Sequence, residues 1–203
     1  MAEEAWAIEE SKLSDFGDVR LNNRFTNILN NLGNSPNYSL PIACKGWKET
    51  LAAYRFINNE KVSADKIIHP HSSATLERIK EENTVLILQD TTEIDFTGRD
   101  SLADMGYLSS VHSKGFYLHP SIAVTPDKRC LGVLDINSWV RKEIGISKEN
   151  KRLNKPIEEK ESYCWLNGYE VANNIAISAP NTTIVNVTDR EGDIYELLEK
   201  QPS

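Results

Sequence analysis

Apolar residues in the first eighty positions recur at the spacing of helix faces. One such face is predicted by five residues that follow the three-to-four spacing of a helix: Leu21, Phe25, Ile28, Leu29 and Leu32. Asp18 precedes them as a suitable N-cap, and Gly33 follows as a suitable stop. A polar stretch over 33–41 predicts a loop, and two further helices are expected over 47–57 and 63–79.

After residue 80 the pattern changes to short apolar runs. Three strands are predicted there, over 85–88, 115–125 and 130–141. The first is continuously apolar, which is typical of a strand buried on both faces. A loop containing Gly98 and Gly106 separates it from the second, and Pro126-Asp127-Lys128 supplies the turn between the second and third.

The rest of the chain alternates between helix and strand. A polar, lysine-rich exposed connection is predicted over 142–155, a helix over 158–179, a buried strand over 183–188 and a last helix over 191–200. The first three strands can form an antiparallel meander, and the fourth can return parallel to the first by a right-handed crossover. We therefore predict an α/β fold: a helical domain over 1–80, then an incomplete ribonuclease-H-like mixed sheet over 81–203. Other α/β folds share this element order.

Composition is that of a soluble globular protein, with 39% hydrophobic and 26% charged residues. No apolar run approaches the roughly 20 residues of a membrane span, and the acidic N-terminus is unlike a secretory signal. We expect a cytoplasmic, nucleoid-associated protein. Cys44, Cys130 and Cys164 are too scattered for a disulfide framework or zinc site. They are expected to be small core residues.

Charge is unevenly distributed along the chain. The net charge is −7, yet the segment from residue 20 to residue 55 contains a single acid, Glu49. Its basic residues are Arg20, Arg24, Lys45, Lys48 and Arg55. Short helices with a basic face suit contact with DNA phosphates. The alternative is a solvated surface on which charges cluster by chance.

Two aspartates each follow a predicted strand directly. Asp90 and Asp189 would emerge at one carboxyl edge of the sheet if their strands are parallel neighbours, and ligands of open α/β sheets bind at such edges. Two close carboxylates repel each other unless a cation lies between them. Mg²⁺ suits such a site because it prefers oxygen ligands. The alternative is that both are ordinary turn residues.

Other polar and aromatic residues are expected to be structural. His69 and His71 could be metal ligands, but Pro70 between them favours a turn. His119 is expected to serve strand packing or a hydrogen bond. Tyr54 and Phe56 are expected in the core.

The chain resembles the Tn-five-type transposases, in the IS-four group of bacterial insertion sequences and the DDE class. Six segments carry the resemblance in the family's order: 16–20 (FGDVR) with Arg24, 53–57 (AYRFI), 88–92 (LQDTT), 115–119 (GFYLH), 159–162 (EKES) with Trp165, and 188–194 (TDREGDI). Together they extend the similarity from about residue 13 to residue 198.

The resemblance implies roles for particular residues. Asp90 and Asp189 would be catalytic carboxylates that bind Mg²⁺ or Mn²⁺. Arg20, Arg24 and Arg55 would contact double-stranded DNA at the terminal inverted repeats of a transposon. Arg190 would meet a phosphate near the metals or pair with a nearby Glu. Lys45 and Lys48 would contact DNA or belong to a plain exposed face.

The chain departs from the family pattern after Asp189. Family members carry a third metal-binding glutamate further on, as well as a C-terminal dimerisation region, and the sequence contains neither. We therefore expect an N-terminal fragment of a DNA transposase that binds metal weakly and is inactive alone. The competing hypotheses are a non-catalytic module that occupies transposon ends against the intact enzyme, and a small metal phosphohydrolase.

Overall fold

The computed structural model of the chain describes residues 2–99, 102, 104–110, 112–142 and 156–200. It divides into two compact units, Met1–Glu77 (unit 1) and Arg78–Ser203 (unit 2). Most of the connection predicted over 142–155 lies outside the described residues.

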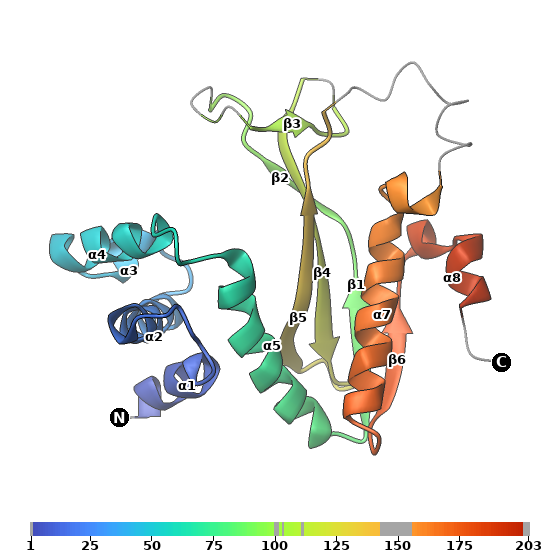
Figure 1. Cartoon of the computed structure of the whole chain (residues 1–203), viewed down its shortest axis with the longest axis horizontal. Helices are drawn as coiled ribbons and strands as arrows, with labels where there is room; N and C mark the ends of the chain where they lie inside the picture. Colours follow the sequence, from blue (N-terminus) through green and yellow to red (C-terminus); the bar gives the residue numbers. More distant parts are fainter. Residues whose placement is uncertain (1, 100–101, 103, 111, 143–155, 201–203) are drawn as a thin grey trace. The chain divides into compact units, whose positions relative to one another are not determined.

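Unit 1 is helical (Figure 1). Its helices are α1 (Ala2–Ser11), α2 (Val19–Gly33), α3 (Leu40–Ala43), α4 (Trp47–Ile57) and α5 (Ala64–Lys80), the last of which runs into unit 2. The three predicted helices are confirmed as α2, α4 and α5, whereas α1 and α3 are additional. Asp18 caps α2 as expected, because its side chain accepts a hydrogen bond from the amide of Arg20.

Three phenylalanines form the centre of unit 1. Phe16 packs edge-on against Phe25 and Phe56, with ring centroids 5.4 and 5.1 Å apart. Phe56 is thus a core residue, as expected. The same expectation for Tyr54 is wrong, since this side chain is 45% exposed. Residues two apart on a helix point about 200° apart, so α4 cannot bury both against one core.

Pro70 lies inside α5, so the predicted turn at this position is wrong. Proline removes one helical hydrogen bond, but Pro70 is buried, and Ile67 one turn before it packs against the core of unit 1. Apolar burial therefore keeps the helix continuous. His69 is exposed, while Nδ1 of His71 lies 2.6 Å from Oε2 of Glu10.

The sheet of unit 2 is organised around one long strand, β4. Its strands are β1 (Thr84–Gln89), β2 (Thr92–Asp95), β3 (Gly106–Tyr107), β4 (Lys114–Val124), β5 (Cys130–Trp139) and β6 (Thr183–Val187). β4 pairs antiparallel with β1, β2, β3 and β5, and β6 pairs parallel with β1. The antiparallel meander and the parallel return are confirmed. β2 and β3 occupy the segment predicted as a loop.

One long helix packs on the sheet (Figure 1). The helical segments after the sheet's first strands are η2 (Ile157–Glu159), α7 (Tyr163–Ser178), η3 (Arg190–Gly192) and α8 (Tyr195–Glu199). α7 covers the sheet face that carries His119, whose ring meets that of Trp165 edge-on at 4.5 Å. It begins later than predicted, because η2 and a turn occupy residues 157–162.

Neither β1 nor β6 is buried on both faces, so that prediction is wrong. Alternate residues of β1 are buried and half-buried. In β6, Val185 and Val187 are 39% and 36% exposed. They lie on the sheet face away from α7. Among the described strands β6 pairs with β1 alone, which leaves it at an edge.

The turn between β4 and β5 forms as predicted. The amide of Thr125 donates to the carbonyl of Arg129 at 2.9 Å, and Lys128 adopts the left-handed backbone conformation (φ 71°) that such turns require.

Cysteine burial follows the prediction in two of three cases. Cys44 and Cys164 are buried, and burial raises the pKa of the Cys164 thiol to about 11. Cys130 is exposed, so its assignment to the core is wrong. It pairs with Val124 at the end of the hairpin, where the strand emerges from the sheet.

Candidate nucleic-acid interface and acidic site

The first two arginines of the basic segment are paired with acids. Arg20 donates from Nε and Nη2 to the carboxylate of Asp18, at 3.2 and 3.0 Å. This hydrogen bonding lowers the pKa of Asp18. Arg24 joins α2 to α4 by an ion pair with Glu49, with Nη1 and Oε2 2.5 Å apart. The acid that interrupts the basic segment thus partly neutralises one of its predicted DNA contacts.

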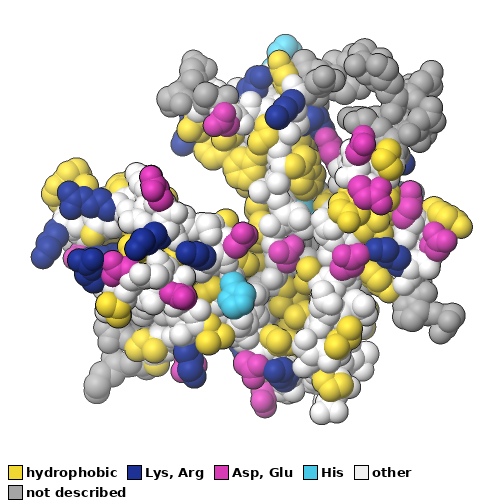
Figure 2. Space-filling model, in the orientation of Figure 1, with side chains coloured by type: hydrophobic (Ala, Val, Ile, Leu, Met, Phe, Trp, Pro, Cys, Tyr) yellow, Lys and Arg dark blue, Asp and Glu magenta, His cyan; other side chains and the backbone are white. Residues whose placement is uncertain are grey.

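The remaining three predicted contacts, Lys45, Lys48 and Arg55, are exposed. The described part of the chain contains no ion pair for any of them. Lys48 and Arg55 are seven residues apart on α4 and therefore share a face of the helix. Lys45 stands in the α3–α4 connection with a left-handed backbone (φ 54°). Figure 2 shows Lys and Arg side chains gathered over the helical unit 1.

Asp90 and Asp189 stand at corresponding positions of neighbouring parallel strands. β1 and β6 pair in a register that matches Leu88 with Val187, and each aspartate lies two residues further on. Both are exposed. Oδ1 of Asp90 accepts from the amide of Thr91, and Oδ1 of Asp189 from the amide of Glu191, each at 2.8 Å. The structure therefore places the two aspartates at the same edge of the sheet, as the sequence predicts.

Asp90 lies at an interruption in an otherwise continuous ladder. β1 and β2 pair with β4 in one unbroken register, Gln89 with Ser121 and Thr92 with Leu118. This register places Asp90 opposite Pro120. Proline has no N–H to donate to a ladder. Asp90 and Thr91 belong to neither β1 nor β2, so Asp90 lies outside the regular strand pairing.

Buried polar side chains form a hydrogen-bond network at the point where the ladder is interrupted. His119 is completely buried, and its Nδ1 lies 2.8 Å from Oγ1 of Thr91. Its Nε2 lies 3.3 Å from Oε1 of Gln89, whose amide nitrogen donates to Oδ1 of Asn186 in β6. The network ties β4, β1 and β6 together beneath the two aspartates. It confirms the hydrogen-bonding and packing role expected of His119.

Burial lowers the pKa of His119, against the opposing effect of Asp90 and Asp189. The folded state therefore binds fewer protons than the unfolded state near pH 6.5, the ordinary pKa of a histidine side chain. We expect the stability of unit 2 to fall as pH drops below about 6.5, by at most about 1.4 kcal/mol per pH unit. Urea unfolding across this range measures the slope, and His119→Gln should flatten it. An unchanged slope in His119→Gln would show that protonation of His119 does not cause the pH dependence.

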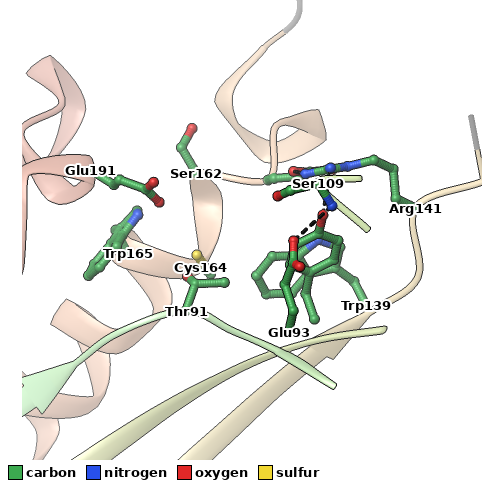
Figure 3. A pocket seen from close by; sticks show the side chains of 11 residues that line it. Thr91, Glu93, Ser109, Trp139, Arg141, Ser162, Cys164, Trp165 and Glu191 are labelled. Carbon is green, nitrogen blue, oxygen red and sulfur yellow. Dashed lines mark hydrogen bonds and ion pairs between the residues drawn. The ribbon is translucent and has the colours of Figure 1, made fainter. Parts of the chain in front are cut away.

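A cavity of about 330 Å³ lies beside the sheet edge that carries Asp90 and Asp189, which we call the acidic site. Figure 3 shows its two sides: Thr91, Cys164, Trp165 and Glu191 on one, and Glu93, Trp139 and Arg141 on the other. Thr91 and Glu191 are neighbours of the two aspartates in sequence. Arg141 holds the carboxylate of Glu161 by two hydrogen bonds and donates to the hydroxyl of Tyr117 at 2.6 Å.

The cavity is acidic overall. Glu93, Glu161 and Glu191 line it together with one cation, Arg141. Hydrogen bonding with Ser109 lowers the pKa of Glu93, because it stabilises the ionised carboxylate. Sequence reasoning missed Glu93, Trp139 and Arg141 as site residues. The rings of Tyr117 in β4 and Trp139 in β5 stack with their centroids 5.5 Å apart. Because this contact joins two strands, the sequence of either strand alone does not predict it.

The two aspartates do not by themselves complete a three-ligand metal site. Within the described residues, no group of three or more His, Cys, Asp or Glu side chains is placed to hold a metal ion. Arg190 is exposed, and its predicted alternative, an ion pair with a nearby Glu, is not found in the described part of unit 2. No described helix is both long enough and apolar enough to cross a membrane.

Unit 1 thus has the features of a small helical nucleic-acid-binding domain: a closed aromatic core and an exposed basic face on one helix. Residues 3–62 match the family described as transposase DNA-binding. The match covers α1 to α4 and less than a third of the chain. It supports a transposase-related DNA-binding domain in this segment.

Proposed function

We propose that the chain is part of a DDE-class DNA transposase, in which unit 1 binds the transposon ends and unit 2 belongs to a ribonuclease-H-like catalytic domain. The observation that supports it most is the coincidence of two features. Residues 3–62 match transposase DNA-binding domains, and further along the chain two aspartates stand in register at the ends of parallel strands.

The donor set at the sheet edge fits a divalent cation. Asp90 and Asp189 offer exposed carboxylates on adjacent strands, and the cavity beside them is also acidic. Oxygen ligands of this kind suit Mg²⁺ or Mn²⁺. The ion would neutralise charge at a phosphodiester and polarise an attacking water or 3′-hydroxyl. The buried Gln89–His119–Thr91 network would hold the carboxylate of Asp90 in position.

Metal affinity is expected to be weak, because the described residues place no third carboxylate with Asp90 and Asp189 to hold an ion. Titration with Mn²⁺, followed by its electron paramagnetic resonance signal, should give binding that Asp90→Asn and Asp189→Asn each abolish. An Asp127→Asn control alters a carboxylate at the β4–β5 turn and should bind as before. Binding that survives both site variants would exclude this edge as the metal site. The non-catalytic competitor hypothesis predicts no binding at all.

DNA binding is tested by a gel shift at fixed salt, comparing inverted-repeat ends with random duplex. Salt must be held constant, because phosphate contacts alone change affinity by orders of magnitude. Arg55→Ala should weaken binding, whereas Lys66→Ala, an exposed lysine of α5, should not. Equal loss on both DNAs would mean a phosphate contact, and loss on the ends alone a base contact. Absence of binding by the folded protein would exclude the proposed role of unit 1.

The Arg24–Glu49 pair makes a further prediction. Glu49→Gln removes the acid that competes with DNA for Arg24, so affinity should rise about three- to tenfold at low salt, with a salt dependence steeper by about one unit. Arg24→Ala should lower the affinity for DNA. Thermal unfolding of both variants controls for stability, since the pair also joins α2 to α4. A fall in affinity for both variants would show that the pair acts only by holding the two helices.

A further inference from the structure

The exposed side of α4 also carries aromatic side chains, next to the face that holds Lys48 and Arg55. Trp47, the first residue of the helix, is 78% exposed, and Tyr54 is 45% exposed. Seven residues separate them, so they lie on one side of the helix, about 10 Å apart along its axis. Together with Lys48 and Arg55 they form what we call the α4 surface.

The two pairs of this surface run in parallel. Lys48 follows Trp47 and Arg55 follows Tyr54, and consecutive helical residues point about 100° apart, so the aromatic pair and the cationic pair form two adjoining rows along the exposed side of the helix. A tryptophan this exposed loses the favourable free energy of burying its ring, roughly 25 cal/mol per Å² of apolar area. The core of unit 1 does not need it, because Phe16, Phe25 and Phe56 already fill that core. Trp47 is therefore available to a partner, and the neighbouring cations favour an anionic one.

Resting on the DNA-binding function proposed above, we infer that the α4 surface recognises DNA that contains unstacked or unpaired bases. Trp47 and Tyr54 would stack on the bases while Lys48 and Arg55 hold the adjoining phosphates. Alternating aromatic and basic groups are the usual means of binding single-stranded nucleic acid, since each base offers a face for stacking and each phosphate a charge. Intact duplex hides its base faces, so it can use only the two cations.

The two kinds of contact separate experimentally. Fluorescence anisotropy, at fixed salt, would compare a short labelled duplex with the same duplex carrying a central mismatched bubble. The unaltered chain should bind the bubble about tenfold more tightly. Trp47→Ala should remove most of this preference and leave duplex affinity nearly unchanged. Tyr54→Ala should reduce it in the same way.

Two controls accompany these variants. Tyr38→Ala removes an aromatic that is 61% exposed but lies before α3, and should keep the full preference. Trp47→Phe retains a stacking ring and should keep part of it, which separates stacking from general loss of structure. Lys48→Ala should weaken binding to both DNAs and lower the salt dependence by about one unit.

Several results would overturn the inference. Retention of the full bubble preference in Trp47→Ala would exclude stacking. Equal weakening on both DNAs would mean that the indole packs against the backbone instead. Sedimentation showing a dimer that Trp47→Ala dissociates would make the α4 surface an interface between copies of the chain. Duplex binding without any bubble preference contradicts only this inference, whereas absence of all DNA binding contradicts the proposed function as well.

Discussion

Phe16→Ala is expected to destabilise unit 1 by about 3–5 kcal/mol, the usual cost of deleting a buried phenylalanine side chain. Phe16 has no exposed surface, and its ring closes the cluster formed with Phe25 and Phe56. Phe16 lies in the connection before α2 and belongs to no helix. Its amide donates a hydrogen bond to Oδ1 of Asn22 at 3.0 Å, which holds the residue in place. Surrounding helices cannot collapse into the space without moving this connection.

A loss of this size approaches the whole stability of a small domain. Unit 1 should therefore lose its cooperative unfolding transition and its DNA binding together, as followed by chemical-shift dispersion in NMR spectra and by gel shift. Phe16→Leu keeps most of the volume and should cost much less. Tyr38→Ala serves as the exposed aromatic control. Wild-type-like unfolding of Phe16→Ala would show that the aromatic cluster is not the core of this unit.

Sequence periodicity found the elements whose stability comes from their own apolar face. α2 and α4 contribute to the core of unit 1, and β1, β4 and β5 were visible as apolar runs. β2 was missed because its residues are mostly exposed, and it forms by pairing with β4. At Pro70 the sequence predicted a turn, but the residue lies inside helix α5. Burial of the proline ring outweighs its local preference for a turn.

The candidate sites were predictable to different degrees. Asp90 and Asp189 could be paired because strand ends are readable and parallel pairing follows from the crossover connection. The Arg24–Glu49 pair could not be predicted, since 25 positions separate the two residues in sequence. The support beneath Asp90 was equally hidden. Gln89 looked like the polar end of a strand, yet it is 4% exposed and bonded to residues of two other strands.

That buried glutamine makes Gly168 of α7 the most sensitive glycine of the acidic site. A Cβ at position 168 would lie 1.8 Å from Oε1 and 2.3 Å from Cδ of Gln89. Gln89 cannot move aside without losing its hydrogen bonds to His119 and Asn186. We expect Gly168→Ala to destabilise unit 2 by about 2–3 kcal/mol, from overpacking and unsatisfied polar groups. The better helix propensity of alanine, about 1 kcal/mol, opposes this only in part.

A double-mutant cycle identifies the cause of this loss. Gln89→Ala removes the side chain that the new methyl group would strike, so in that background Gly168→Ala should become neutral or stabilise by about 1 kcal/mol. Urea unfolding of the four proteins measures the coupling, with Ile177→Ala on the exposed side of α7 as the control within about 0.5 kcal/mol. Equal effects of Gly168→Ala in both backgrounds would mean that Gln89 is not the obstacle. Reversal of sign would establish that α7 needs glycine there to approach the strand that carries Asp90.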